Sequence, residues 1–250
     1  MTLPTIAAAF LILGIGASLQ ASVGFGMGMM SVPLLLWVGF TLPECVSMVM
    51  GAAAVQMTSG LWLYREHIDL RHSMPIAGFQ CATIPLGVLA MGLLADLGKE
   101  PVQQAVGVSI LAALVFRQVA KPTPRVSVPF WWGGVAGSLT GFLGGMIAMG
   151  GPPMVFYALS HAWPKEKFRA FIWTQFLTAS PIILFALWWR FGNIAPAGAL
   201  LGVAAAPCVI AGSRLALWAT AEWDTDNAQM AAVGLLSILG VTSIVRPLLG

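Results

Sequence analysis

Two glycine-rich segments are the part of this sequence whose residue types and spacing could do chemistry. The first, ASVGFGMGMMSVP, occupies residues 21–33, and the second, GFLGGMIAMGGPP, occupies residues 141–153. If each lies inside a membrane, a helix broken at these glycines exposes unpaired backbone N–H groups, which must face protein, water or a bound ion rather than lipid. Helix N-termini also carry partial positive charge and donate hydrogen bonds to anions. The two breaks therefore predict a binding site for a small anion.

The two segments occupy matching places in two similar halves of the chain. Identical residues align at an offset of 120: Ser18 with Ser138, Gly24 with Gly144, Met29 with Met149, and Pro33 with Pro153. Gln56 aligns with Gln175 at an offset of 119. We interpret this pattern as an internal duplication, a recurrent design in transporters. Close helix packing is the alternative role of such glycines, but their duplication at equivalent positions favours a site.

The polar side chains expected inside the membrane are neutral. Cation transporters and proton relays usually place Asp or Glu within the helix bundle. Here all nine acidic residues fall at or beyond the ends of the predicted spans: Glu44, Glu66, Asp69, Asp96, Glu100, Glu166, Glu222, Asp224 and Asp226. Because neutral donors suit an anion, we predict a substrate site made of these residues: Gln20, Ser22, Gly24, Gly26, Gly28, Ser31, Gln56, Ser59, Thr140, Gly144, Gly145, Gly150, Gly151, Gln175 and Thr178. We predict no catalytic residue, no metal ligand and no cofactor.

Two other classes of function remain as alternatives. A copper transporter is the second hypothesis, because thioethers suit Cu(I) and five methionines lie near the breaks: Met27, Met29, Met30, Met146 and Met149. Methionine also serves as adaptable packing, and the nearby Cys and His ligands that a copper path needs are missing from the sequence. An intramembrane enzyme is the third hypothesis, but no His is paired with a nucleophile and no carboxylate dyad lies within the spans.

Membrane helices must position these segments, because the composition fits no soluble class. Hydrophobic residues make up 58% of the 250 residues and charged residues 8%, with a mean hydropathy of +0.88, whereas soluble domains carry about 25% charged residues. The long continuous uncharged runs favour helices over an outer-membrane barrel. The net charge of +3 contains no basic block that could bind phosphates, so we predict contact with membrane lipid and no nucleic-acid partner. The oligomeric state stays open, with a homodimer as one arrangement.

The predicted fold is an all-α polytopic membrane protein made of two repeats. Each half has one long glycine-broken stretch, at 1–43 and 126–160, and three ordinary spans, near 43–65, 74–96 and 101–120 and near 166–189, 196–218 and 227–246. We divide the chain into a first repeat at 1–120, a cytoplasmic linker at 121–128 and a second repeat at 129–250. The apolar N-terminus lacks the basic region of a signal peptide, which predicts a retained membrane segment.

The positive charges decide between two topologies. If each long stretch crosses once, Lys and Arg divide seven to five between the two faces, which discriminates poorly. If each enters and returns as a re-entrant hairpin, they divide nine to three, with only Lys99, Arg190 and Arg246 opposite the rest. Because cytoplasmic loops are rich in Lys and Arg, we predict hairpins, inverted repeats and both termini in the periplasm.

At the segments GFGMGMMSVP and GGMIAMGGPP the sequence resembles the sulfite exporter TauE/SafE family of membrane permeases, also described as the toluene-sulfonate uptake permease family. The resemblance covers nearly the whole chain and also rests on its length and on two halves joined by a polar linker. It implies transport of sulfur-containing oxyanions or related small organic acids, such as sulfite, sulfonates and sulfoacetate, across the bacterial inner membrane. Phe25, Met27 and Met29 separate the glycines of the first segment, in place of a run of adjacent glycines.

Overall fold

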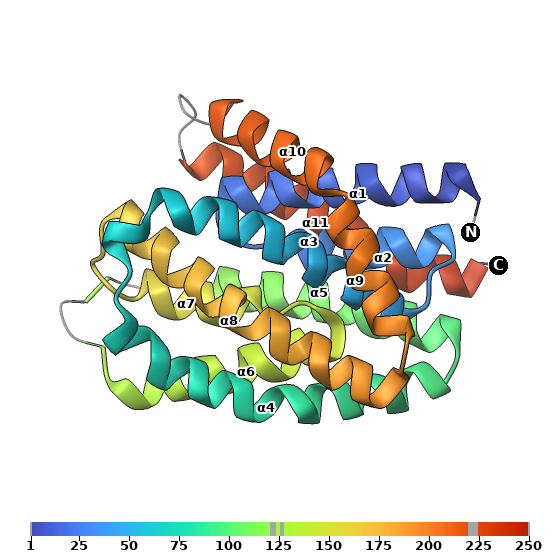
Figure 1. Ribbon diagram of the computed structural model, residues 1–250, viewed down its shortest axis with the longest axis horizontal. Coiled ribbons are helices and arrows are strands. Elements are labelled where there is room, and N and C mark those ends of the chain that lie inside the picture. Colours follow the sequence, from blue (N-terminus) through green and yellow to red (C-terminus); the bar gives the residue numbers. More distant parts are fainter. Residues whose placement is uncertain (1, 121–123, 126–127, 220–224, 250) are drawn as a thin grey trace.

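The regular structure of the described residues is helical (Figure 1). The computed structural model describes residues 2–120, 124–125, 128–219 and 225–249. Its elements are, in order, α1 (Leu3–Val23), α2 (Met27–Val38), α3 (Leu42–Leu63), the short 3-10 helix η1 (Arg65–His67), α4 (Leu70–Asp96), α5 (Lys99–Ala120), α6 (Phe130–Ile147), α7 (Gly151–Leu159), α8 (Lys165–Phe191), α9 (Ile194–Ala204), α10 (Ala206–Ala219) and α11 (Thr225–Leu249).

The first long stretch folds into a hairpin of two antiparallel helices. Helix α1 ends at Gly24, whose φ of 85° lies in the left-handed region that glycine adopts without strain. Helix α2 then runs back along α1, with the Ser31 hydroxyl donating to the Ile12 carbonyl at 3.4 Å. Gly16 lies against Ser31 and against the carbonyl of Met27, so its missing side chain allows the two helices to approach. The glycine break thus reverses the chain instead of only bending it.

The second long stretch folds in the same way, with α7 returning along α6. Gly150 lies against the backbone of Thr140, and Gly133 lies against the ring of Tyr157, so the two helices are antiparallel. Ala148 ends α6 with a φ of 58°, and the N–H groups of Ala148 and Met149 donate to the carbonyls of Gly144 and Leu143. The bond from the left-handed Ala148 to the Gly144 carbonyl is that of an αL cap. The sequence-predicted segments therefore contain both chain reversals.

The other helices lie close to the predicted bounds of the ordinary spans, with one exception in the second half. Residues 196–218 were expected to form one span, but α9 and α10 are bent by 52° at Ala205. Pro207 lies in the first turn of α10, where its missing N–H is tolerated. In the middle of one continuous helix, its ring would clash with the preceding turn. This half therefore contains two broken segments.

Pairs of helices with small residues between them build the bundle. Helix α4 packs along α6, α1 along α10, α3 along α9 and α8, and α5 along α11. Glycines bring the backbones together: Gly141 and Gly145 lie against α4, Gly202 lies against Met48 of α3, and Gly14 lies against Cys208. Small residues dominate helix contacts in membranes because association there depends on close van der Waals packing.

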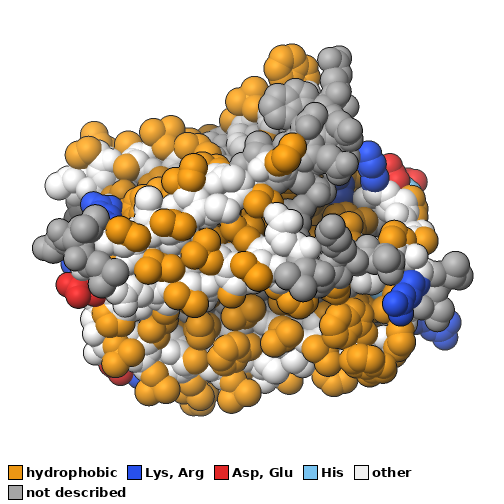
Figure 2. All heavy atoms as spheres, turned by 180° about the vertical axis from the view of Figure 1, so that it is seen from behind, with side chains coloured by type: hydrophobic (Ala, Val, Ile, Leu, Met, Phe, Trp, Pro, Cys, Tyr) orange, Lys and Arg blue, Asp and Glu red, His pale blue; other side chains and the backbone are white. Residues whose placement is uncertain are grey.

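The outer surface and the helix lengths define a multi-pass membrane protein. Large hydrophobic side chains cover the middle of the face in Figure 2, and its charged side chains gather toward the two ends. Four of the described helices are long and apolar enough to cross a membrane, or five if α9 and α10 form one span. Both termini lie at one end of the bundle, and the end of α5 and the start of α6, which the linker joins, lie at the other (Figure 1).

Candidate functional site

A small internal pocket lies where the two chain reversals meet. Its volume is about 50 Å³. The first break contributes Gly26, Gly28 and Met29, and the second contributes Ala148 to Pro152. Helices α1, α3, α4, α6 and α8 complete the wall. Because a water molecule needs roughly 10 to 15 Å³ of such space, the pocket has room for a few water molecules or for one compact ion.

Two helix N-termini face this pocket. Gly26 is the N-cap of α2, with a φ of 115°, and the first intrahelical bond runs from the N–H of Met30 to the Gly26 carbonyl at 2.9 Å. The N–H groups of Met27, Gly28 and Met29 therefore have no carbonyl partner within the helix. Helix α7 offers fewer donors, because Pro152 and Pro153 follow Gly151 and carry no N–H. The positive end of α2 is thus the stronger donor to an anion.

Two buried polar side chains of the pocket have no hydrogen-bond partner. Gln80 on α4 is 2% exposed and Thr140 on α6 is 1% exposed. The Gln80 Oε1 and the Thr140 Oγ1 are both fully buried and unpaired. Ser180 also lines the pocket, but its hydroxyl donates to the Phe176 carbonyl at 2.8 Å. Because an unpaired polar group is costly inside a protein, a polar ligand in the pocket that bonded to these two atoms would offset that cost.

The rest of the wall is uncharged. Among the described residues that line the pocket there is no Asp, Glu, Lys, Arg or His. Gln20 on α1 lies at the same pocket, as do Met29, Met50 and Met149. An anion in the pocket would therefore be stabilised only by helix N-termini, amides and hydroxyls.

Seven of the fifteen residues proposed for the site line this pocket: Gln20, Gly26, Gly28, Thr140, Gly144, Gly150 and Gly151. The other eight lie elsewhere. Ser22, Ser59 and Thr178 donate to carbonyls of their own helices, those of Ser18, Gln56 and Thr174. Ser31 bonds to Ile12 between α1 and α2, Gly24 lies beside the Phe168 ring, and Gly145 packs against α4.

Gln56 and Gln175, the remaining two, join neighbouring helices. The Gln56 Nε2 donates to the Ala17 carbonyl at 2.8 Å and to the Ser213 hydroxyl at 2.9 Å, which joins α3 to α1 and α10. The Gln175 Nε2 donates to the Ser73 carbonyl at 2.8 Å, which joins α8 to α4. The Nε2 of each amide is therefore occupied by the protein, while the Oε1 of each is buried without a partner, as it is in Gln80.

Sequence reasoning missed Gln80 and Ser180. Like Gln56 and Gln175, Gln80 lies inside an uncharged span. It was not selected because no polar residue of the second half aligns with it at the repeat offset. Ser180 lies on α8 one residue before Pro181, which looks like helix packing in sequence.

The two breaks are also displaced by one helical turn relative to the sequence alignment. Gly24 and Gly144 align in sequence, but Gly24 ends α1, whereas Gly144 lies inside α6. In the structure the caps correspond at an offset of 124, Gly24 with Ala148 and Gly26 with Gly150. Gly144 therefore lies in the pocket wall, with open space beside it. An added Cβ there would meet only the Ile183 side chain, at 3.5 Å.

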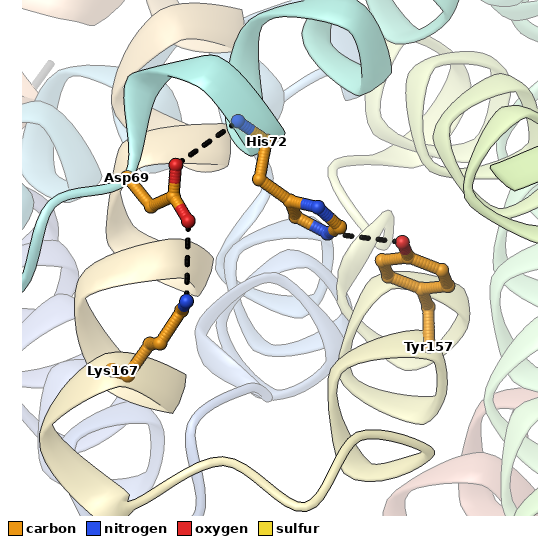
Figure 3. A network of polar contacts seen from close by, with 4 residues as sticks. All are labelled: Asp69, His72, Tyr157 and Lys167. Atoms are coloured by element: carbon orange, nitrogen blue, oxygen red, sulfur yellow. Dashed lines mark hydrogen bonds and ion pairs between the residues drawn. The ribbon is translucent and has the colours of Figure 1, made fainter. Parts of the chain in front are cut away.

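A polar cluster ties three helices together at the linker end of the bundle (Figure 3). Asp69 caps α4 by accepting from the N–H of His72 at 3.2 Å, and it pairs with Lys167 of α8 at 3.1 Å. The His72 Nε2 and the Tyr157 hydroxyl of α7 share a hydrogen bond of 3.1 Å. The Lys167 ammonium, followed by the His72 N–H, holds the pKa of Asp69 below its usual value. The cluster therefore fixes the far end of the broken helix α7.

Comparisons with known proteins identify the family of this helical membrane protein. The family described as Sulfite exporter TauE/SafE matches residues 8–243. The chain belongs to this family, which confirms the resemblance found in the sequence. A "Probable sulfite/organosulfonate exporter TauE" from Cupriavidus necator is 25% identical over 240 residues, covering 92% of this chain and 90% of that protein. No solved structure matches the chain.

Proposed function

We propose that this protein is a secondary transporter of small sulfur-containing oxyanions, such as sulfite or small organosulfonates, across the bacterial inner membrane. The substrate binds in the pocket between the two broken helices. The observation that carries this proposal is the meeting of the α2 and α7 N-termini at a cavity with unpaired buried groups on Gln80 and Thr140. Membership of an exporter family supports transport rather than catalysis.

The charge of the pocket supports an anionic substrate. Unpaired N–H groups at Met27, Gly28 and Met29 and the hydroxyl of Thr140 are donors, and no carboxylate lines the wall. Charge-assisted hydrogen bonds contribute about 1.5 to 3 kcal/mol each, so several are needed to offset the loss of an anion's hydration shell. Oxygen-rich anions accept more such bonds than halides do, so the proposal includes a preference for oxyanions over chloride.

Helix packing supports an inverted repeat around this pocket. If α1 corresponds to α6, α3 to α8 and α4 to α9 with α10, then the contact of α4 with α6 corresponds to that of α10 with α1. The contact of α8 with α4 likewise corresponds to that of α3 with α9. The α1–α2 hairpin opens toward the termini, whereas the α6–α7 hairpin opens toward the opposite end of the bundle (Figure 1). There the Arg125 N–H donates to the Ser160 carbonyl. Hairpins that enter from opposite faces are a transporter design that supports alternating access.

Transport of radiolabelled sulfite into proteoliposomes tests the proposal. We expect uptake that saturates with sulfite and is competed by small sulfonates but not by an equal concentration of chloride. Empty liposomes and liposomes with heat-denatured protein are the controls. Absence of saturable uptake in both orientations, together with absence of sulfite binding to the purified protein, would rule the function out.

A copper transporter is the second candidate, because Met29, Met50 and Met149 line the same pocket. Thioethers are soft ligands that suit Cu(I). The two functions make opposite predictions for Met50→Leu, which keeps the side chain's bulk and removes its sulfur. Sulfite uptake should continue in this variant, whereas a copper path would lose Cu(I) binding. Direct titration of the purified wild-type protein with Cu(I) completes the comparison.

A further inference from the structure

The Gln80 amide gives the pocket a hydrogen-bond acceptor that a bare anion cannot use. A Gln amide presents both an NH₂ donor and a carbonyl acceptor, whichever way it is turned. In Gln80 the Oε1 is fully buried without a donor, on a side chain that is 2% exposed and lines the pocket. The Thr140 hydroxyl, which also lines the pocket, can donate to an anion, but the Gln80 Oε1 needs a hydrogen from the ligand.

The uncharged wall also discriminates between one negative charge and two. Among the described lining residues there is no cation to balance a second charge. The energy of transferring an ion out of water grows with the square of its charge, so a dianion loses far more hydration than a monoanion in a pocket of this kind. A ligand with one negative charge and one acidic hydrogen matches both features.

We infer that the pocket takes its oxyanion in the singly protonated, singly charged form, with the ligand's O–H donating to the Gln80 Oε1. This inference rests on the proposed function and narrows its substrate class to hydrogensulfite. Sulfonates carry one charge but no acidic hydrogen, so they should bind as chlorate does and compete with sulfite only weakly. For sulfite the transported species is hydrogensulfite, which forms when sulfite takes up one proton near neutral pH. The anionic oxygens then accept from the α2 N-terminus and Thr140, and the Gln80 Oε1 gains a donor.

Chlorate is the probe that distinguishes the effect of the ligand's charge on binding from the effect of its proton. It is a pyramidal trioxoanion like sulfite, carries one charge at every pH used, and has no hydrogen to donate. Calorimetric titrations of the purified full-length protein compare total sulfite with chlorate at pH values on both sides of the sulfite protonation step. We expect the affinity for total sulfite to follow the hydrogensulfite fraction, about tenfold weaker for each pH unit above that step. Chlorate should bind with an affinity that does not change with pH.

The chlorate titration also controls for ionisation of the protein. The charged and imidazole groups of the helices that line the pocket lie near their ends: Glu44 in α3, Arg71, His72 and Asp96 in α4, and Lys165 to Arg169 and Arg190 in α8. Helices α1, α2, α6 and α7 have none. If these distant groups changed the pocket with pH, both anions would respond, whereas a response of sulfite alone comes from the ligand.

Gln80→Leu and Gln80→Met test the acceptor. Neither variant breaks a hydrogen bond of the Gln80 Oε1, which has no partner, so both are expected to fold. In the wild type we expect hydrogensulfite to bind about tenfold more tightly than chlorate, and in both variants this ratio should fall close to one. Gln175→Met is the matched control, because Gln175 is equally buried but donates to the Ser73 carbonyl away from the pocket, so the ratio should stay at the wild-type value.

Two results would overturn the inference without touching the proposed function. One is sulfite affinity that is constant with pH or rises with the dianion fraction, and the other is a hydrogensulfite-to-chlorate ratio that is unchanged in both Gln80 variants. If neither anion binds to the wild type, the proposed function itself fails.

Discussion

The carbonyl of Ala148 lies directly against Gly28, so a Cβ on Gly28 would overlap with it. Ala148 ends α6 and Gly28 lies in the first turn of α2, so this contact joins the two broken segments at the pocket. Gly150 has a similar relationship to the backbone of Thr140. The glycines of the breaks therefore do both things that the sequence suggested as alternatives: they allow close packing, and by that packing they place two helix N-termini at one cavity.

Gly28→Ala is expected to destabilise the protein. The added methyl must displace the Ala148 backbone, and such overpacking typically lowers the free energy of unfolding by about 1 to 3 kcal/mol. Thermal unfolding of the purified protein in detergent measures this loss. Gly78→Ala on α4 is the control, because a Cβ there meets nothing within 4 Å, and it should leave the midpoint unchanged or raise it. Equal midpoints for the two variants would show that the helices separate easily at Gly28.

Gln56→Leu and Gln175→Leu were expected from the sequence to weaken substrate binding. Because both amides join helices away from the pocket, we now expect a loss of stability instead, of about 0.6 kcal/mol per interhelical hydrogen bond. Sulfite affinity, measured by calorimetry on protein that remains folded, should stay within about twofold of wild type. A large loss of sulfite affinity with unchanged stability would show that these two residues belong to the substrate site.

The stability of the linker end should fall in mild acid because of His161. Burial lowers the pKa of this imidazole from its ordinary value of 6.5, while its hydrogen bond to the Tyr157 carbonyl opposes the shift. The unfolded chain therefore binds a proton before the folded protein does, so His161 contributes stability above pH 6.5 that is lost as the pH falls below it. Unfolding midpoints measured across this range should decline less in His161→Gln than in wild type. Parallel declines would assign the pH dependence to other groups.

The termini and the linker should face opposite sides of the membrane, with the linker in the cytoplasm. The termini lie at the opposite end of the bundle from the end of α5 and the start of α6 (Figure 1), and the distribution of Lys and Arg predicts which end is inside. Alkaline phosphatase fused to the C-terminus should be active, and a cytoplasm-active fluorescent protein inserted at the linker should fluoresce. The reverse pattern of reporter activity would invert the orientation and leave the fold unchanged.

Local sequence patterns predicted the fold where one feature dominates. Uncharged runs located the helices, and the paired Gly and Pro segments located both reversals, because glycine adopts the left-handed conformation seen at Gly24 and Gly26. The exact break of the second half was harder to predict, since Ala148 is the residue in the left-handed conformation, stabilised by its cap bonds to α6. The bend at Ala205 was missed because the proline that follows it is compatible with either a kink or a new helix.

The lining of the pocket was predicted only in part, because tertiary packing decides which polar side chains lie at it. In sequence, Gln56, Gln80 and Gln175 look alike, each lying in an uncharged span. In the structure, the Nε2 atoms of Gln56 and Gln175 donate to carbonyls of neighbouring helices, and among these three residues Gln80 alone lines the pocket. The internal repeat pointed to Gln56 and Gln175 and left Gln80 out, because two aligned residues can share a structural role as readily as a binding role.

Sulfite binding by Gly144→Ala tests the central claim, that the anion occupies the pocket between the two breaks, most directly. An added Cβ at Gly144 fills pocket space and meets only the Ile183 side chain at 3.5 Å, so the fold should tolerate it. Gly134→Ala is the matched control on the same helix, with a Cβ 3.5 Å from the Phe79 ring and no part in the pocket wall. We expect calorimetry to show at least about tenfold weaker sulfite binding in Gly144→Ala, since steric exclusion from a pocket this small removes several hydrogen bonds, and wild-type binding in Gly134→Ala. Wild-type affinity in a folded Gly144→Ala protein would contradict the account, because the anion would then bind elsewhere.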